Sequence, residues 1–215
     1  PDEKEIGTVA ERAKQKCLNA LNNLKNNDYD FILGIDDVFE IHGRIETEVK
    51  KIIPDINYKT EAEIFNEYTK NKYNAEADFL ECSSTNCGNN ITNLLEIIKK
   101  EQLDFNNIIL IQDAAMQLRM SAVIKKYIDK SIEVINYAAY KVKVINEDSK
   151  LIYDNYPLGM WNIERYINLL MGEIPRLTDN EEGYGPRGKD FLIHIDIPEK
   201  VENAFLELKN IIPIW

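Results

Sequence analysis

The sequence predicts an α/β fold that is Rossmann-like and doubly wound, with a mainly parallel sheet and helices on both faces. Short apolar runs typical of buried strands alternate along the chain with amphipathic helical patterns, and polar loops follow the strands. Strands separated by helical crossovers pair in parallel. In such a sheet, ligands bind beyond the carboxyl ends of the strands. The sequence therefore predicts both a fold class and the place of a ligand site.

The first third of the chain contains a predicted helix, a strand and a second helix. Thr8–Glu11 has the form of a capping box, and apolar residues then recur at helical spacing to about Asn27. The run 31–35 is apolar throughout and leads into Asp36 and Asp37, which is typical of a buried strand that ends in a polar loop. A second capping box at Thr60–Glu63 opens a helix to about Lys72.

The middle of the chain repeats this order of strand, polar turn and helix. We expect strands at 78–82, 107–111, 132–136 and 140–145, and helices at 91–100 and 115–127. A helix at 161–171, a glycine-rich loop at 183–188, an alternating strand at 191–197 and a last helix from Pro198 complete the chain. We divide it into an N-terminal helical segment (1–30), a Rossmann-like α/β core (31–145) and a C-terminal extension of helix, loop and strand (146–215).

Charge and composition exclude several classes of function. The 215 residues include 26 Lys and Arg against 37 Asp and Glu, a net charge of −11, so no net positive field exists to collect nucleic-acid phosphates. No apolar run approaches the roughly 20 residues that a membrane helix needs. Three cysteines form no disulfide framework, and the first residues show no signal peptide, so we expect a cytoplasmic protein. The oligomeric state is left open.

The glycine-rich loop Gly183–Gly188 matches the G-x-G-x-x-G dinucleotide fingerprint in letters only. That fingerprint joins a strand to a helix whose first amides face a pyrophosphate. This loop precedes a predicted strand and contains Pro186, which lacks an amide hydrogen. We interpret it as a rigid loop that carries Arg187.

The segment Ser83–Asn90 places eight polar or small residues between a predicted strand and helix. One of them suffices to cap the helix, and the others favour a loop that binds an anion or polar ligand. Cys82 and Cys87 have the wrong spacing for a zinc site and are interpreted as two buried thiols. Of the two histidines, His42 is the better functional candidate, and His194 is interpreted as a satisfied core or surface residue.

Arginine is rare in this chain, with six Arg against 20 Lys. Such a composition suggests that Arg is placed where a planar, bidentate donor is needed. Arg44, Arg119 and Arg187 are the ligand candidates. The alternative is that they pair with carboxylates of the chain itself, such as Asp113, Asp179 or Asp190.

Several motifs together resemble those of the YdcF-like proteins, relatives of the SanA and ElyC envelope-associated group. They span positions 59 to 198 and are Lys59–Glu63, Ser84–Gly88 with Asn90, Gln112–Asp113 with Met116, Gln117 and Arg119, Trp161–Tyr166, Gly172–Leu177 and Gly183–Gly188 with Asp190 and Phe191. The last of these blocks separates the YdcF-like branch from the membrane-anchored branches.

The resemblance implies a Rossmann-like fold that binds S-adenosylmethionine at the strand ends, without a well-established reaction. Together with Arg187, the ligand-binding residues are then Gly34, Asp36, Asp37, Gly43, Arg44, Thr85, Asn86, Asn90, Gln112 and Arg119. Carboxylates can accept hydrogen bonds from ribose hydroxyls, and the sulfonium charge suits an acidic protein. No metal is implied.

One departure from the family pattern lies between the first strand and His42. The family has a helix and a second strand there, whereas six residues separate Ile35 from His42 in this chain. Because a helical crossover needs a dozen residues or more, we predict that a segment is absent near Glu40 and Ile41. Consecutive Cα atoms spaced at about 3.8 Å throughout this region would contradict that prediction.

Binding of a small adenosine-type ligand, most simply S-adenosylmethionine, is the first functional hypothesis. The alternative is a hydrolase or transferase acting on a phosphorylated or pyrophosphate substrate such as an envelope precursor, with Glu61 or Asp113 as general base and the arginines as an anion clamp. A methyltransferase and a non-enzymatic interaction module are further alternatives. The sequence does not decide whether the protein is an enzyme.

Overall fold

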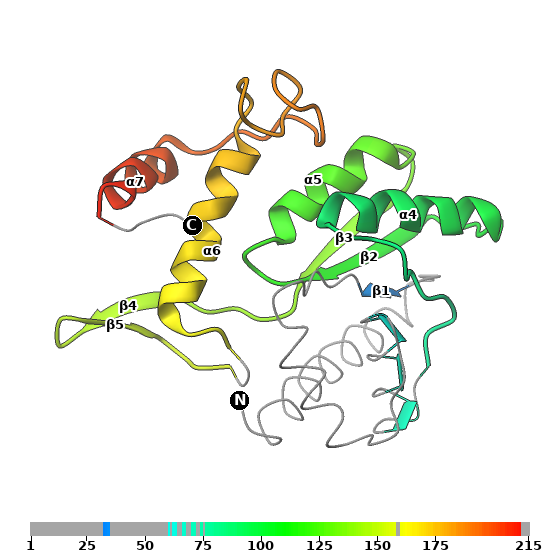
Figure 1. Cartoon of the computed structure of the whole chain (residues 1–215), viewed down its shortest axis with the longest axis horizontal. Coiled ribbons are helices and arrows are strands. Elements are labelled where there is room, and N and C mark those ends of the chain that lie inside the picture. The colour runs from blue at the N-terminus through cyan, green and yellow to red at the C-terminus, as the bar shows by residue number, and fades with distance from the viewer. Residues whose placement is uncertain are drawn as a thin grey trace. The chain divides into compact units, whose positions relative to one another are not determined.

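The computed structural model describes residues 32–34, 60, 62–63, 66–67, 70–71, 74, 76–157 and 160–211. It divides into two compact units, one of Ile35–Asp104 and one of Pro1–Gly34 with Phe105–Trp215. The elements in chain order are β1 (Ile32–Gly34), α4 (Cys87–Lys100), β2 (Asn107–Gln112), α5 (Gln117–Tyr127), β3 (Glu133–Ala138), β4 (Val144–Glu147), β5 (Lys150–Tyr153), α6 (Ile163–Leu177) and α7 (Glu199–Lys209) (Figure 1). The fold is mixed α/β, as predicted.

Three of the predicted strands form a parallel sheet in the order β1-β2-β3. Ile109 of β2 is in register with Ile32 of β1 and with Ile135 of β3. All three strands therefore end at the same edge of the sheet. The strand order does not reverse among the described strands, so the doubly wound topology stays a prediction.

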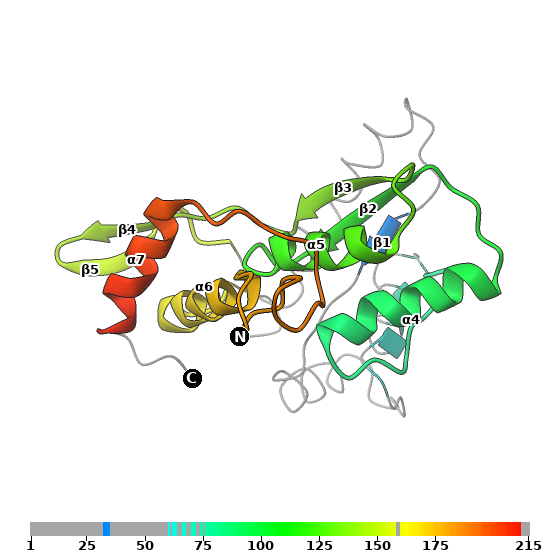
Figure 2. The same cartoon turned by 90° about the horizontal axis from the view of Figure 1, so that it is seen from above.

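The core of the larger unit forms around β2. Ile108, Ile109 and Leu110 are each at most 2% exposed, although consecutive side chains point to opposite faces of the sheet. Both faces of β2 are thus covered, as its continuous apolar run predicts. On one side α5 packs against β2 and β3 and buries Met120 and Ile124 completely (Figure 2). Each such side chain stabilises the fold by about 1.5–3 kcal/mol.

The described part of the smaller unit begins with the predicted capping box. Thr60 N–H donates to Glu63 Oε2 over 3.0 Å, and Glu63 N–H donates back to Thr60 Oγ1 over 3.4 Å. In α4 the residues Cys87, Ile91 and Leu94 form the buried stripe, so this helix starts four residues before the predicted 91. The predicted strand at 78–82 is wrong. That segment is irregular, has no ladder partner among the described residues and leaves Phe79 43% exposed.

The strand predicted at 140–145 is displaced and belongs to a hairpin that was not predicted. β4 and β5 pair antiparallel, and Glu147 lies opposite Lys150. Asp148 and Ser149 between them have φ values of 50° and 62°. Two successive left-handed residues make the type I′ turn that favours two-residue hairpins. That turn usually has glycine at its second position, so an Asp-Ser pair gives no strong signal in the sequence.

The C-terminal part confirms both predicted helices and corrects the strand. α6 continues past Gly172 and includes Pro175 before it ends at Leu177, and α7 begins after Pro198. Residues 191–197 form neither helix nor strand and pair with no strand among the described residues. Instead, Ile193 N–H donates to Ala122 O of α5 over 3.3 Å, and Leu192 is completely buried. The alternating pattern therefore reflects burial against a helix.

Candidate functional site

The carboxyl ends of the three parallel strands bring several predicted site residues to one edge of the sheet. Gly34 ends β1 in register with Ile111, and Gln112 ends β2 opposite Ala138. The chain after β3 is attached to this edge, because Ala139 N–H donates to Gln112 O over 2.8 Å. This edge is the place where parallel α/β sheets bind ligands.

Gln112 is the most unusual residue at this edge. It is 2% exposed, and its Oε1 accepts a hydrogen bond of 2.7 Å from Asp113 N–H. Its buried Nε2 donates to no group among the described residues. A buried donor without an acceptor costs about 1–3 kcal/mol, so such groups are rare and call for an explanation. A bound ligand with a hydrogen-bond acceptor beside Nε2 would satisfy this donor.

Asp113 follows Gln112 and fixes the loop around it. Its Oδ1 accepts from Ala115 N–H over 2.8 Å and from the Tyr140 hydroxyl over 2.7 Å, and its Oδ2 accepts from Trp161 Nε1 over 3.0 Å. Both carboxylate oxygens are thus used within the chain. This arrangement suits a residue that positions the strand-end loop, and a role as general base stays a prediction.

The partners of Asp113 belong to an aromatic cluster. Tyr140 and Tyr153 both make edge contacts with Tyr166, at centroid distances of 6.3 and 5.6 Å. Burial, followed by the charge of Asp113 and the hydrogen bond to it, raises the pKa of Tyr140 well above its usual range. Tyr140 is therefore a neutral hydroxyl donor over the whole physiological range of pH. This holds the loop after β3 to Asp113.

The N-terminus of α4, in the smaller unit, carries three more predicted ligand residues. Asn86 is the N-cap, with its Oδ1 accepting from Asn89 N–H over 3.0 Å, and Thr85 Oγ1 donates to Asn89 Oδ1 over 3.2 Å. Asn90 is 7% exposed, and its buried Nδ2 has no hydrogen-bond partner among the described residues. The cap is thus present at Asn86, and ligand binding by this loop stays a prediction.

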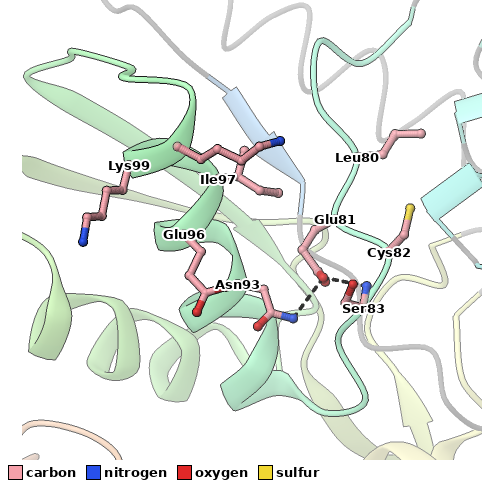
Figure 3. A pocket seen from close by; sticks show the side chains of 9 residues that line it. Leu80, Glu81, Cys82, Ser83, Asn93, Glu96, Ile97 and Lys99 are labelled. Atoms are coloured by element: carbon pink, nitrogen blue, oxygen red, sulfur yellow. Dashed lines mark hydrogen bonds between the residues drawn. The ribbon is translucent and has the colours of Figure 1, made fainter.

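An open groove of about 650 Å³ lies between α4 and the irregular segment before it (Figure 3). Its polar centre is Glu81, whose Oε1 accepts from Ser83 N–H over 2.7 Å and from Asn93 Nδ2 over 3.0 Å. Although burial raises the pKa of Glu81, these hydrogen bonds and those from Ser84 outweigh it and lower the pKa overall. Glu81 thus ties the segment to the helix.

The prediction of two buried thiols is half wrong. Cys87 is buried in the first turn of α4, whereas Cys82 is a free thiol exposed at the groove. Because 78–82 is not a strand, none of the described residues buries the side chain of Cys82. No group of three or more His, Cys, Asp or Glu among the described residues could hold a metal ion.

Arg119 and Arg187, two of the predicted anion ligands, each lie against a carboxylate of the chain. Arg119 is 8% exposed and donates to Glu173 through Nε (2.6 Å) and Nη2 (3.1 Å). This bidentate geometry is the strongest form of an ion pair. Arg187 is exposed, and its Nε lies 3.3 Å from Asp179 Oδ2. Both arrangements correspond to the structural alternative considered from the sequence.

The glycine-rich loop folds around Asp179. Asp179 Oδ1 accepts from Arg187 N–H over 2.6 Å, and its Oδ2 lies 2.7 Å from His194 Nδ1. His194 Nε2 lies 3.0 Å from Asp196 Oδ1 on the other side of the ring. The loop is a compact turn that follows α6, and its rigidity stays a prediction. His194 is a surface residue with satisfied ring nitrogens, as predicted.

This Asp179–His194 contact makes the stability of the loop depend on pH. The hydrogen bonds of His194 with Asp179 and Asp196 raise its pKa above 6.5. Because the folded pKa exceeds the unfolded one, the contribution is complete below about pH 6.5 and is lost as the pH rises through the folded value. We expect the difference in Tm between the wild type and His194→Gln to shrink as the pH rises from about 6 to about 9. Thermal unfolding at several pH values measures it, and a difference that grows with pH would contradict this assignment.

The remaining predicted site residues lie outside the described residues. These are Asp36, Asp37, Gly43, Arg44 and Glu61, together with His42 and the position of the predicted absent segment near Glu40 and Ile41. Their roles stay predictions. None of the described helices is both long and apolar enough to span a membrane.

Other residues at the strand-end site were not predicted as functional, because the sequence contains no local signal for them. Tyr140 and Trp161 reach Asp113 from 27 and 48 positions away. Gln117 Nε2 donates to Leu110 O and to Asn136 Oδ1, which joins α5 to β2 and β3. Such contacts follow from the tertiary fold alone.

A scan of the chain against models of known protein families finds no match. The resemblance to the YdcF-like proteins therefore stays a prediction.

Proposed function

We propose that the protein binds a small adenosine-type ligand, most simply S-adenosylmethionine, at the carboxyl ends of its parallel strands, as a YdcF-like protein with a doubly wound, Rossmann-like core. The observation that carries the proposal is the buried Nε2 of Gln112, which has no acceptor among the described residues at the end of the central strand. The motif resemblance identifies the class of ligand. The parallel sheet supports the location, since ligands of such sheets bind at this edge.

The chemistry of the edge suits a ligand rich in hydrogen-bond acceptors. The Gln112 amide can donate to a ribose oxygen, a ring nitrogen or a carboxylate of the ligand, and Gly34 at the end of β1 has no side chain that would obstruct a ligand. Asp36 and Asp37, which follow β1 in the sequence, would accept from ribose hydroxyls. A cationic sulfonium suits a chain with a net charge of −11.

Replacing Gln112 by Leu should weaken ligand binding without a matching loss of stability. The variant removes the donor offered to the ligand, and we expect the Kd for S-adenosylmethionine to rise about tenfold or more. Within the chain, the substitution also removes the hydrogen bond that Gln112 Oε1 accepts from Asp113 N–H. Removal of an unsatisfied buried amide offsets the absence of that bond, so the free energy of unfolding should change by less than about 1 kcal/mol. Isothermal calorimetry and urea unfolding measure the two quantities.

Asn168→Leu is the matched control, because Asn168 Oδ1 is also buried without a partner among the described residues but lies on α6. This variant should bind like the wild type. Titrations with S-adenosylmethionine, S-adenosylhomocysteine and adenosine nucleotides test the ligand class. Absence of heat and of any thermal shift with all three would reject the proposal, and unchanged affinity in Gln112→Leu would reject the assigned location.

The described residues do not support the alternative, an enzyme that acts on a phosphorylated substrate. Its anion clamp needs available guanidinium groups, and both Arg119 and Arg187 face carboxylates. Its general base needs an available carboxylate oxygen, and both oxygens of Asp113 accept hydrogen bonds. Ligand binding therefore accounts for the arrangement better than hydrolysis does. Transfer of a methyl group requires an acceptor site that nothing among these residues indicates.

A further inference from the structure

The hairpin of β4 and β5 has an exposed strand edge. The two strands form a sheet of their own, and no third strand joins it among the described residues. In Figures 1 and 2 its turn points away from α6. A two-stranded hairpin is only marginally stable in water, and its unpaired edge is a template for another strand. The edge of β4 thus has the form of an interaction surface.

The turn determines which backbone groups of β4 face outward. In a hairpin with a two-residue turn the residues that flank the turn, here Glu147 and Lys150, exchange backbone hydrogen bonds, and such pairs recur at every second position. Farther along the strand, Lys143 O accepts from Asp154 N–H over 2.9 Å, which agrees with this alternation. The backbone groups of Val144 and Asn146 therefore face away from β5. No hydrogen bond occupies them among the described residues.

The side chains along this edge are self-complementary. Lys143, Ile145 and Glu147 alternate with the outward-facing backbone positions and so share one face of the strand. Ile145 is 40% exposed, although it is apolar. If the same strand of a second copy pairs antiparallel with Ile145 opposite Ile145, then Lys143 of each copy lies opposite Glu147 of the other copy.

We propose that β4 pairs antiparallel with β4 of a second copy of this chain, about a twofold axis at Ile145. Val144 then exchanges backbone hydrogen bonds with Asn146 of the second copy, and each of the two symmetric pairs closes two bonds. Ile145 contacts Ile145 of the second copy, and Lys143 lies opposite Glu147 of the second copy. The result is a four-stranded antiparallel sheet.

The charges select this register over its neighbours. The second strand can also shift by two residues along the first, because such a shift keeps Val144 and Asn146 in hydrogen-bonded positions. A shift in one direction places Ile145 opposite Lys143, and a shift in the other places it opposite Glu147. Only the register centred on Ile145 matches apolar with apolar and opposite charges with each other. Because two four-residue strands bury little area, the dimer should be weak and dependent on concentration.

Charge exchange tests the pairing. Lys143→Glu and Glu147→Lys each place like charges opposite each other twice, so each should raise the dimer Kd about tenfold or more in sedimentation equilibrium. The double variant Lys143→Glu/Glu147→Lys should restore wild-type association. Lys141→Glu makes the same charge change opposite Ser149 and should have little effect. Circular dichroism verifies that each variant is folded.

Cross-linking tests the register independently. Ile145→Cys, in a Cys82→Ser background, brings two thiols together across the axis at a separation that a disulfide can span. It should form a covalent dimer under mild oxidation, whereas Leu151→Cys, at a position that is 48% exposed on β5, should form little. A wild type that stays monomeric at every concentration, failure of the double variant to restore association, or equal cross-linking of the two cysteine variants would overturn the proposal.

Discussion

Replacing Glu173 by Gln should destabilise the protein by about 3–5 kcal/mol, the cost of removing one partner of a buried ion pair. The side chains of Arg119 and Glu173 are 9% and 7% exposed, and their shortest contact is 2.6 Å. Glutamine keeps the size of the side chain but removes the negative charge that the buried guanidinium faces. The Arg176 guanidinium, 3.5 Å away, also loses the charge of this carboxylate. Guanidinium chloride unfolding, with the slope m held fixed, measures the loss.

Two variants separate charge from packing at this pair. Arg119→Met/Glu173→Leu removes both charges and should recover most of the stability, because a buried ion pair contributes little relative to apolar residues of similar size. Glu101→Gln removes the carboxylate of the exposed pair with Lys100 and should change the free energy of unfolding by less than about 0.5 kcal/mol. If Glu173→Gln also lowers the free energy of unfolding by less than about 1 kcal/mol, the Arg119–Glu173 pair is not buried away from water in the folded protein.

The same pair bears on the predicted anion site. At Arg119 the scarcity of arginine correctly indicated a position where a planar, bidentate donor is required. The sequence could not indicate whether the acceptor is a ligand or a carboxylate 54 residues away on another helix. Composition restricts the chemistry of a side chain, whereas the tertiary fold selects its partner.

The elements that could be predicted are those whose sequence signal lies within a few neighbouring residues. The apolar run of β2 and the capping box at Thr60 both contain their signals within a few residues, and both are present. The failures at 78–82 and 191–197 have a common origin. Alternating or apolar residues report which side of a segment is buried, but a strand also needs a neighbour with free backbone groups. The segment at 191–197 meets α5 instead.

The common edge at which the strands end was predictable, whereas the contacts at that edge were not. Parallel strands end at one edge for geometric reasons, so Gly34 and Gln112 meet there as expected. The unsatisfied amide of Gln112 was not predictable, because satisfaction of a buried group depends on every neighbour in three dimensions. The contacts of Asp113 with Tyr140 and Trp161 are of the same kind.

Replacing Gly183 by Ala should destabilise the protein by about 3 kcal/mol or more, because the glycine-rich loop has no room for a side chain. A Cβ atom at Gly183 would lie 1.9 Å from Thr178 O, which is backbone and cannot swing aside. The loop is also tightly bonded to itself, since Gly183 O accepts from Lys189 N–H over 2.9 Å. Relief of the clash must therefore break the turn that holds Asp179 against His194. Thermal and chemical unfolding measure the cost.

Gly172→Ala is the matched substitution for this loop. The Cβ added there would approach Arg176 Nη1 at 2.9 Å, the end of a flexible and partly exposed side chain that can move. Because Gly172 lies inside α6, alanine also gains up to about 1 kcal/mol of helix propensity, and the net change should be small. Equal losses in the two variants would show that the backbone of the loop yields easily. A large loss confined to Gly183→Ala would instead identify close backbone packing as the reason that three glycines occur in six residues.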